Sequence, residues 1–533
     1  MKMRRAWAGV AAVAAAALVG ALGAVPVSAY AETVTVKTAD ELATAINAGN
    51  DVVLGDNITA SVTVPADKTV TIDLGGHTLT NEAGKHTITN NGTLTITGAG
   101  TVDNVSHAHA AVYNQAGATA TLGAANYTRS KEAGTSPDEP NGNSYYNVVN
   151  QGTMTIDSGA VVKQDGHFSS LVENGWYNGN QNTTKAPSKL TINGGSFSGG
   201  INTIKNDDWG ELTINDGEFS NNTGSTLMNW NVAEVNGGTF SITQDGARIF
   251  SNGYGDDTMD KGELVINDGN FIAANDGAGD LFTSGKGSVT GGTVAISGGT
   301  FQGKLDGIET NGIDVSVSGG AYTDVNVTRY VDADSATTSS LDMFVVGSAD
   351  GVVDGSVAAV EVNGKKVYFD SVEAAENFAK ENGADGEVLP VERTKYIVTY
   401  VANGKTVKTQ TVKPGDALGT LPEAGEYEGY TFDGWYVDVT EGADGSADGT
   451  KIDETYKPTG DVTVTAMWTE NAPSTPSTPS TPAAGSTDAQ PVEAPKKALP
   501  QTGDTTNAAL PVAIAIAGFV VIAAAVALRK RHN

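Results

Sequence analysis

The sequence predicts a mainly β protein built around a long stack of short strands. Three observations predict this fold class: short apolar segments ending in Gly-containing turns recur through most of the first 330 residues, Gly makes up 66 of the 533 residues, and no Cys is present to staple small units together. A chain of this length is too long for one compact core, so we expect several units in series.

The repeat is clearest between residues 190 and 301. Four segments there read LTINGGSF, LTINDGEF, LVINDGNF and VAISGGTF, and they begin at Leu190, Leu212, Leu264 and Val294. Apolar and polar residues alternate before each turn, which is the period-two pattern of a β-strand. Strands this short cannot bury a face alone, whereas equivalent strands stacked about 4.8 Å apart enclose one continuous apolar interior.

Each copy contributes one aliphatic residue that we expect to lie above its equivalents in the stack. These residues are Leu74, Ile96, Leu122, Ile156, Ile192, Ile214, Val235, Ile266, Ile296 and Val317. The shortest copies span 21 or 22 residues, which fits three short strands and three turns. The pattern resembles the right-handed parallel β-helix of pectate-lyase-like proteins and of many bacterial surface proteins, over residues 50–330.

A second set of equivalent residues is polar. Short apolar strands are followed by Asn90, Asn114, Asn150, Asn174, Asn206, Asn229 and Asn311, with Ser251 and Thr283 at the corresponding places of two copies. Stacked side-chain amides can hydrogen-bond along the axis, and Asn tolerates the left-handed backbone that a corner requires. We interpret these residues as a structural ladder rather than a binding site.

Residues 32–49 are predicted to cap the first coil with a strand and a helix. Thr38 and Glu41 have the spacing of a capping box, Leu42 and Ile46 share one helical face, and Gly49 ends the segment. Because the open end of a strand stack has unpaired backbone groups, this helix is expected to cover it.

Both ends of the chain read as targeting segments. Residues 1–31 combine basic residues, an apolar run and small residues before a cleavage site after Ala31, which is typical of a signal peptide. A buried N-terminal helix is the alternative. Near the other end, residues 509–528 are long and apolar enough for a transmembrane helix, and a basic tail follows them.

The segment before that helix is Leu499, Pro500, Gln501, Thr502 and Gly503. With the apolar span and basic tail, residues 499–533 resemble the LPxTG sorting signal of Gram-positive surface proteins. The resemblance implies that a sortase cleaves after Thr502 and joins its carbonyl to a peptidoglycan cross-bridge amine. The protein would then contact the membrane only before sorting. A tail that stays in the membrane is the alternative.

Three segments connect the predicted coil to this anchor. Residues 331–394 include a small ββα unit, with a turn at Asn363-Gly364 and a helix presenting Val372, Ala375, Phe378 and Ala379. Residues 395–469, with YIVTY, GYTFDGWY and VTVTAMW segments, resemble the Listeria-Bacteroides repeat, a β-grasp-like surface module. We expect its Trp435 and Trp468 to be core residues. Residues 470–498 form a Pro/Ser/Thr-rich stalk that is expected to be disordered and extended.

Composition excludes several classes of function. A net charge of −30 argues against a nucleic-acid partner, since phosphates would be repelled. The lack of Cys excludes disulfides, thiolate zinc sites and thiol catalysis, and the six His have no metal-ligand spacing. We therefore expect no cofactor except Ca²⁺, for which unpatterned carboxylates are available at Asp207, Asp208, Asp256, Asp257 and Asp260.

The candidate ligand-binding residues are aromatic and lie just after the ladder positions. They are Trp176, Tyr177, Trp209, Trp230 and Tyr254. On adjacent coils they should line one edge, where aromatic faces beside Asn and Asp suit a carbohydrate. The alternative is that these rings only pack the longer loops onto the coil.

Catalysis on the coil is a competing hypothesis. Glycoside hydrolysis needs a pair of carboxylates, and Asp207, Asp208, Asp256, Asp257 and Asp306 are candidates. The polygalacturonase pattern fails in order and identity, because Gly166-His167-Phe168 precedes Asp207 and the later segment is Arg248-Ile249-Phe250. We therefore assign no catalytic residue. The sequence favours a wall-anchored adhesin for host glycan or matrix, with a polysaccharide lyase or glycoside hydrolase as the alternative and a pure spacer as the third reading.

Overall fold

The computed structural model describes most of the chain between residues 32 and 471. The described residues are 32–130, 145–164, 166, 168–221, 223–244, 246–253, 262–273, 279–284, 291–309, 312–340, 342–381, 387–391, 393–441, 447–471 and 497–498. The predicted signal peptide, sorting signal and transmembrane segment all lie outside these residues. Within the described part, no helix is long and apolar enough to cross a membrane.

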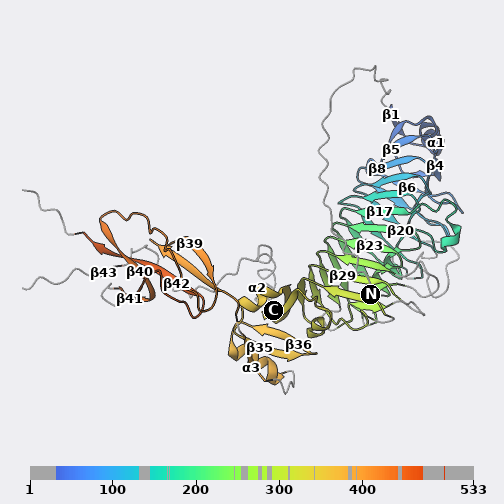
Figure 1. Ribbon diagram of the computed structural model, residues 1–533. Helices are drawn as coiled ribbons and strands as arrows, with labels where there is room; N and C mark the ends of the chain where they lie inside the picture. The colour runs from blue at the N-terminus through green and yellow to red at the C-terminus, as the bar shows by residue number, and fades with distance from the viewer. Residues whose placement is uncertain are drawn as a thin grey trace, which may run out of the picture.

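The first part of the molecule is a coil of three parallel sheets (Figure 1). The first sheet contains β1 (Thr33–Val36), β2 (Asp51–Leu54), β5 (Thr69–Asp73), β8 (Thr93–Thr97), β11 (Thr119–Leu122), β14 (Thr153–Ile156), β17 (Ser188–Ile192), β20 (Gly210–Ile214), β23 (Val232–Val235), β26 (Glu263–Ile266), β29 (Thr293–Ile296) and β31 (Asp314–Val317). Each strand pairs in parallel with its equivalent in the next coil, because every coil presents the same short strand at the same place.

Two further sheets complete each coil. The second sheet contains β3 (Ile58–Thr59), β6 (Thr78–Thr80), β9 (Thr101–Asp103), β12 (Asn126–Thr128), β15 (Val161–Lys163), β18 (Ser196–Ser198), β21 (Glu218–Asn221), β24 (Thr239–Ile242), β27 (Asn270–Ala273), β30 (Thr300–Gln302) and β32 (Gly320–Tyr322). The third contains β4 (Val62–Val64), β7 (Ile88–Asn90), β10 (Val112–Asn114), β13 (Val148–Asn150), β16 (Val172–Asn174), β19 (Asn202–Asn206), β22 (Ser225–Asn229), β25 (Arg248–Asn252) and β28 (Phe282–Ser284). The prediction of a mainly β chain with a β-helix-like stack of parallel strands is confirmed.

The expected column of aliphatic residues is confirmed at nine of its ten positions. The paired residues run from Ile96 through Leu122 and onward to Val317. Leu74 is wrong, because the partner of Ile96 is Ile72. Leu74 is buried in the corner that follows β5, directly before Gly75, and so imitates the position that closes the other strands.

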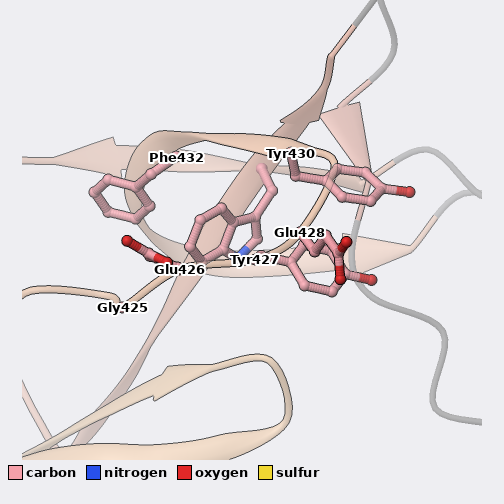
Figure 2. Close-up of a pocket in the computed structure, with 7 residues that line it drawn as sticks. Gly425, Glu426, Tyr427, Glu428, Tyr430 and Phe432 are labelled. Carbon is pink, nitrogen blue, oxygen red and sulfur yellow. The ribbon is translucent and has the colours of Figure 1, made fainter. Parts of the chain in front are cut away.

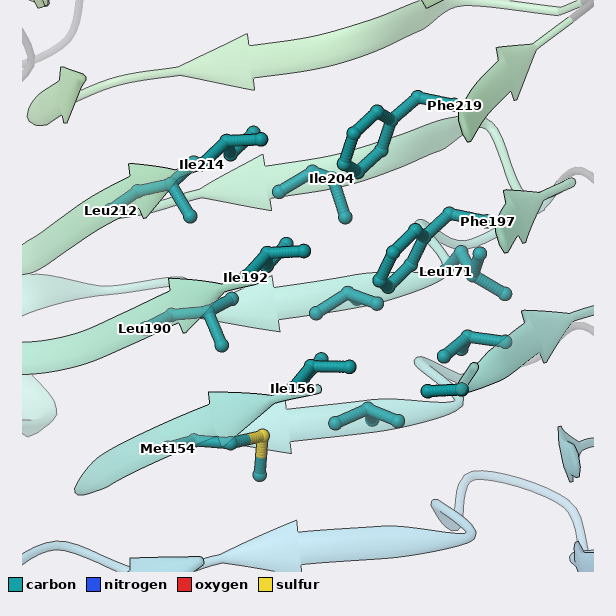
Figure 3. Close-up of a cluster of buried hydrophobic side chains, with 14 of the residues drawn as sticks. Met154, Ile156, Leu171, Leu190, Ile192, Phe197, Ile204, Leu212, Ile214 and Phe219 are labelled. Atoms are coloured by element: carbon teal, nitrogen blue, oxygen red, sulfur yellow. The ribbon is translucent and has the colours of Figure 1, made fainter. Parts of the chain in front are cut away.

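The interior of the coil is a set of stacked side-chain columns. Figure 3 shows Leu190 and Ile192 below Leu212 and Ile214, and Phe197 below Phe219. One aromatic column continues through the second sheet as Phe197, Phe219, Phe240, Phe271, Phe301 and Tyr322. Neighbouring ring centres in this column are 4.5–5.2 Å apart. Four of these ring pairs are stacked and the Phe240–Phe271 pair is tilted, and ring contacts at these distances add to the free energy gained by burial.

The capping helix is confirmed as α1 (Ala39–Ala48). The Thr38 hydroxyl accepts a hydrogen bond from the Glu41 amide, the Glu41 carboxylate accepts one from the Thr38 amide, and Gly49 has the left-handed backbone of a helix terminus. Leu42 and Ile46 are buried against the first coil. The helix therefore covers the open end of the stack.

After the coil, the second sheet continues into a small mixed unit. Its strands are β33 (Ser335–Ser340), β34 (Met343–Ser348), β35 (Ala358–Val362), β36 (Lys365–Phe369) and β37 (Leu389–Pro390), with η2 (Val325–Tyr330), α2 (Ala349–Asp354) and α3 (Val372–Glu381). The expected β-hairpin and helix are present as β35, β36 and α3. Ala375, Phe378 and Ala379 are buried as expected, but Val372 is exposed, because it occupies the first turn of α3.

The last described unit is a separate sheet, drawn at the opposite end of the molecule from α1 (Figure 1). It is formed by β38 (Tyr396–Ala402), β39 (Lys405–Val412), β40 (Tyr430–Glu441), β41 (Ala447–Ile452) and β42 (Val462–Glu470), and β43 (Lys497–Ala498) pairs with β42. Trp435 and Trp468 belong to its buried core, as predicted.

Candidate functional site

The buried asparagine ladder runs along the end of the third sheet. Each side-chain Nδ2 donates to the Oδ1 of the next coil at 2.7–2.8 Å, from Asn90 to Asn114, Asn150, Asn174, Asn206, Asn229 and Asn252. All seven side chains are buried, so every amide is satisfied inside the protein. The ladder is structural, as the sequence indicates.

Two details of the predicted ladder are wrong. Asn252, not Ser251, is paired with Asn229, and Ser284, not Thr283, is paired with Asn252, because Ser251 and Thr283 belong to the adjacent column that contains Met228. The described ladder residues also lack a left-handed backbone, because they end strands and their side chains make the turn instead. For example, the Gly92 amide donates to the Oδ1 of Asn90. Asn311 lies outside the described residues.

The residue before each ladder asparagine lies on the opposite face of the strand, because side chains alternate along a strand. In the third sheet this outer column reads Thr89, Tyr113, Val149, Glu173, Lys205, Met228 and Ser251. Opposite charges therefore occupy neighbouring strands at Glu173 and Lys205. Although they lie on the outer face, both side chains are buried.

Loops cover these two charges and add a third. The Lys205 ammonium forms an ion pair with the Asp207 carboxylate inside the protein. Burial raises the pKa of Glu173 well above its usual range, and the charge of Asp207 raises it further, against opposing effects of Lys205 and Tyr146. Burial also raises the pKa of Asp207, against the attraction of Lys205. The raised pKa of Glu173 favours its neutral form, which suits a buried position beside the Asp207–Lys205 ion pair.

Two of the five predicted aromatic residues flank this cluster. The Lys205 Nζ lies 4.9 Å from the ring centre of Tyr177 and 4.1 Å from that of Trp230. A cation over an aromatic face is attracted by the ring quadrupole. The Tyr177 side chain is 69% exposed and Trp230 is half-buried, so these two rings form the outer surface above the ammonium.

The other predicted aromatic residues have different positions. Trp176 is only 5% exposed, and its backbone forms a bridge to Asp208, so it packs the loop against the coil. Trp209 is half-buried, its indole Nε1 donates to the Gly179 carbonyl, and Lys185 lies 5.4 Å from its ring centre. Tyr254 lies outside the described residues. The expected edge is thus reduced, among described residues, to Tyr177 and Trp230, with Trp209 nearby in sequence.

Trp209 also carries an unusual backbone. Its φ is 63°, which L-residues with large side chains rarely adopt. It occupies a turn in which the Gly210 amide donates to the Asp207 carbonyl. Backbone strain of this kind costs on the order of 1–3 kcal/mol and tends to occur where a side chain must be placed for function.

A shallow hollow of about 370 Å³ lies farther along the same sheet. Its lining includes Thr63, Thr89, His86 and His109. Burial, together with the nearby His109 and Arg129, lowers the pKa of His86 to about 4, and the His86 Nδ1 accepts a hydrogen bond from the Ala110 amide. His86 is therefore neutral at pH 7. The hollow offers hydroxyls and imidazoles, which are groups that can hydrogen-bond to polar ligands.

The predicted calcium ligands are not gathered into a site in the described structure. Asp207 is committed to Lys205, and Asp208 accepts a hydrogen bond from the Gly179 amide. Asp256, Asp257 and Asp260 lie outside the described residues. Across the part of the chain that the structure describes, no group of three or more His, Asp or Glu side chains could hold a metal ion.

Sequence reasoning missed Glu173 and Lys205. The signal that could have identified them is their position, immediately before a ladder asparagine in consecutive copies. Side chains there point outward, and unlike charges on adjacent parallel strands attract one another.

One comparison with known proteins gives a match. Residues 396–467 match the family model of the Listeria-Bacteroides repeat domain, a repeat found in bacterial surface proteins. No curated protein and no solved structure matches the chain. The C-terminal sheet of this protein, from the start of β38 to residue 467 in β42, is thus similar to a surface-protein repeat module.

Proposed function

We propose that this protein is displayed on the surface of a Gram-positive cell and is joined to peptidoglycan by a sortase at Leu499–Gly503. The surface-protein repeat at residues 396–467 supports a place outside the cell. The order of the LPQTG segment, the apolar stretch and the basic tail supports covalent anchoring. The test is Thr502→Ala in the full chain, expressed in a sortase-positive host. The variant should be lost from the muramidase-released wall fraction, and an unchanged wall fraction would refute the anchoring.

We further propose that the coil is an adhesin that binds glycan at the Tyr177–Trp230 surface. The observation that carries this proposal is that two rings, from the coils on either side of the one that carries Lys205, flank its buried ammonium, with Tyr177 mostly exposed. An aromatic ring that is fixed from below offers a rigid face for the C–H groups of a sugar at little cost in conformational entropy. Asn178, next to Tyr177, is exposed and adds a hydrogen-bonding amide.

The glycan proposal is tested with substitutions that leave the coil intact. Tyr177→Ala and Trp230→Ala should each weaken binding to an array of immobilised glycans and matrix proteins by at least tenfold. The matched control is Phe168→Ala, which removes a 60% exposed ring from the loop before β16. Full binding by both site variants, with unchanged thermal unfolding, would refute the proposal.

A second candidate function is cleavage of a polysaccharide by Glu173 and Asp207. The observation that favours it is a pair of neighbouring carboxylates whose pKa values are both raised, as a general acid requires. Both side chains are buried beneath the loops, so a substrate would have to displace Tyr177 or Trp230. New reducing ends or unsaturated products from a polysaccharide panel, abolished by Glu173→Gln, would establish this function in place of adhesion.

A further inference from the structure

A second aromatic surface lies in the C-terminal sheet, far along the chain from the coil. It is a groove of about 610 Å³ whose lining includes Tyr427, Tyr430, Phe432 and Trp468. Figure 2 shows the rings of Tyr427, Tyr430 and Phe432 beside this hollow. The Tyr427 ring centre lies 4.4 Å from that of Tyr430 and 5.6 Å from that of Trp468, and Phe432 is 39% exposed. We call these four residues the aromatic groove.

The groove also contains an unused hydrogen-bond donor. The Trp468 indole Nε1 is buried and, within the described part of the chain, has no hydrogen-bond partner. By contrast, the Nε1 of Trp435 in the same core donates to the Pro422 carbonyl at 2.9 Å. A buried indole N–H normally finds a partner, so the Trp468 donor indicates a ligand that brings a carbonyl group.

Aromatic rings beside a free indole N–H match one class of peptide ligand. Proline-rich segments in the polyproline II conformation pack their rings on aromatic side chains, and their solvated carbonyls accept hydrogen bonds. Such a helix has three residues per turn. Prolines spaced three residues apart therefore form one stripe, with members about 9 Å apart.

This chain contains such a stripe next to the groove. Residues 473–482 read PSTPSTPSTP, which places a proline at every third position. The segment begins two residues after Asn471, whose amide donates to the Gly429 carbonyl beside Tyr430. The chain returns at β43, where Ala498 is paired with Trp468 itself. Both ends of residues 472–496 are thus fixed at the edge of the groove.

We propose that the aromatic groove binds the proline stripe of its own chain, residues 473–482. Because the two ends of the 25-residue tract are tied beside the groove, the stripe is present there at an effective concentration in the millimolar range. Weak contacts of each proline ring are then sufficient for occupancy.

Docking of the stripe does not set the distance between the two ends of the tract. The pairing of β43 with β42 already holds residues 497–498 at the C-terminal sheet. Binding of the stripe therefore covers the aromatic groove and leaves the attachment of the sheet to residues 497–498 unchanged. This proposal depends on the groove and the tract alone and is independent of glycan binding by the coil.

The test uses the full chain, in detergent, labelled with 5-fluorotryptophan and observed by fluorine NMR. The chain has six Trp, and Trp468→Phe assigns the resonance of Trp468. Replacing the prolines at 473, 476, 479 and 482 by Ser should shift the Trp468 resonance and leave that of Trp435 in place. Adding the synthetic peptide PSTPSTPSTP at millimolar concentration should restore the original Trp468 resonance, whereas SSTSSTSSTS should not.

Two exposed apolar residues of the same sheet provide the matched controls. Phe432→Ser, placed in the Pro-to-Ser chain, should abolish rescue by the peptide, while Val407→Ser, at a residue 44% exposed on β39, should retain it. The Trp435 resonance reports in each case whether the sheet is folded. An unchanged Trp468 resonance in the Pro-to-Ser chain would overturn the proposal. A wild-type resonance that moves on dilution would also overturn it, because the groove would then bind the tract of a second copy.

Discussion

The buried asparagine ladder can be tested by removing one amide from its centre. Asn206 is fully buried, and its Nδ2 lies within hydrogen-bonding distance of the Asn229 Oδ1 at 2.8 Å, the Val232 carbonyl at 2.9 Å and the Gly210 carbonyl at 3.1 Å. Its Oδ1 accepts a hydrogen bond from the Nδ2 of Asn174 at 2.8 Å. Asn206→Ala removes all of these interactions and adds no new atom that could clash.

The expected loss of stability follows from the groups left behind. In the variant, the Asn229 Oδ1 and the Val232 carbonyl lose this donor inside the protein, whereas the Gly210 carbonyl still accepts a hydrogen bond from the Asn231 Nδ2. Each buried polar group left unsatisfied costs about 1–3 kcal/mol. Allowing for partial relaxation, we expect Asn206→Ala to lower the free energy of unfolding of the coil by about 3–5 kcal/mol, which is a large share of the ~5–15 kcal/mol typical of a domain.

A second, exposed ladder provides the matched control. The Asn215 Nδ2 donates to the Asn193 Oδ1 at 2.9 Å, and the Asn236 Nδ2 donates to the Asn215 Oδ1 at 3.1 Å, both on the solvent side of a turn. Water can replace these bonds, so Asn215→Ala should cost less than about 0.5 kcal/mol. The assay is urea unfolding of the full chain followed by far-UV circular dichroism. Equal midpoints for the two variants would refute the argument that burial of the ladder stabilises the coil.

Three further substitutions test other parts of the structure. Phe219→Ala removes a buried ring from the aromatic column and should lower the free energy of unfolding by about 3–5 kcal/mol in the same urea assay. A loss of less than about 1 kcal/mol would mean that the column does not stabilise the coil. Thr38→Ala removes the N-cap of α1 and should destabilise this helix by about 1 kcal/mol. Amide hydrogen exchange in residues 39–48 should therefore become faster, and unchanged exchange would contradict the role of the cap. Glu173→Gln tests the raised pKa of Glu173. In the native state the Glu173 carboxyl keeps a proton that it releases above about pH 4.3 in the unfolded chain. The free energy of unfolding of the wild-type protein should therefore fall as the pH rises from about 4.3 towards the pKa of Glu173 in the folded state. In the Gln variant the melting temperature should decline less between pH 4.5 and 8, and parallel curves would show that Glu173 is ionised in the fold.

Much of the coil could be predicted from sequence because its order is local and periodic. Alternation of apolar and polar residues before each turn defines which side chains face inward, and equivalent strands then share one register. The errors have the same physical origin. Leu74 lies two residues after the true column position, Ile72, and Ser251 lies one residue before Asn252. The local pattern does not reveal at which residue a strand passes into its corner.

The candidate site was predictable only in part. The aromatic residues after the ladder were identified by their sequence position, but their exposure depends on how each loop folds over the coil. Trp176 turns inward, whereas Tyr177, its neighbour, remains exposed. The pairing of Glu173 with Lys205 requires the register between β16 and β19, which joins residues 32 positions apart. Burial of this pair arises from tertiary contacts and has no local signature.

The most direct test of the account is a distance measured along the coil. The chain has no Cys, so Thr119→Cys and Asp314→Cys, both at exposed positions, can be spin-labelled selectively. These residues belong to one column of the first sheet and are separated by seven parallel pairings. At about 4.8 Å per pairing, electron–electron double resonance should give a narrow distribution centred near 34 Å between the two backbones, and the pair Thr119→Cys with Glu263→Cys should give about 24 Å. Equal distances for the two pairs, or broad distributions, would contradict a stack of coils and the glycan-binding surface built on it.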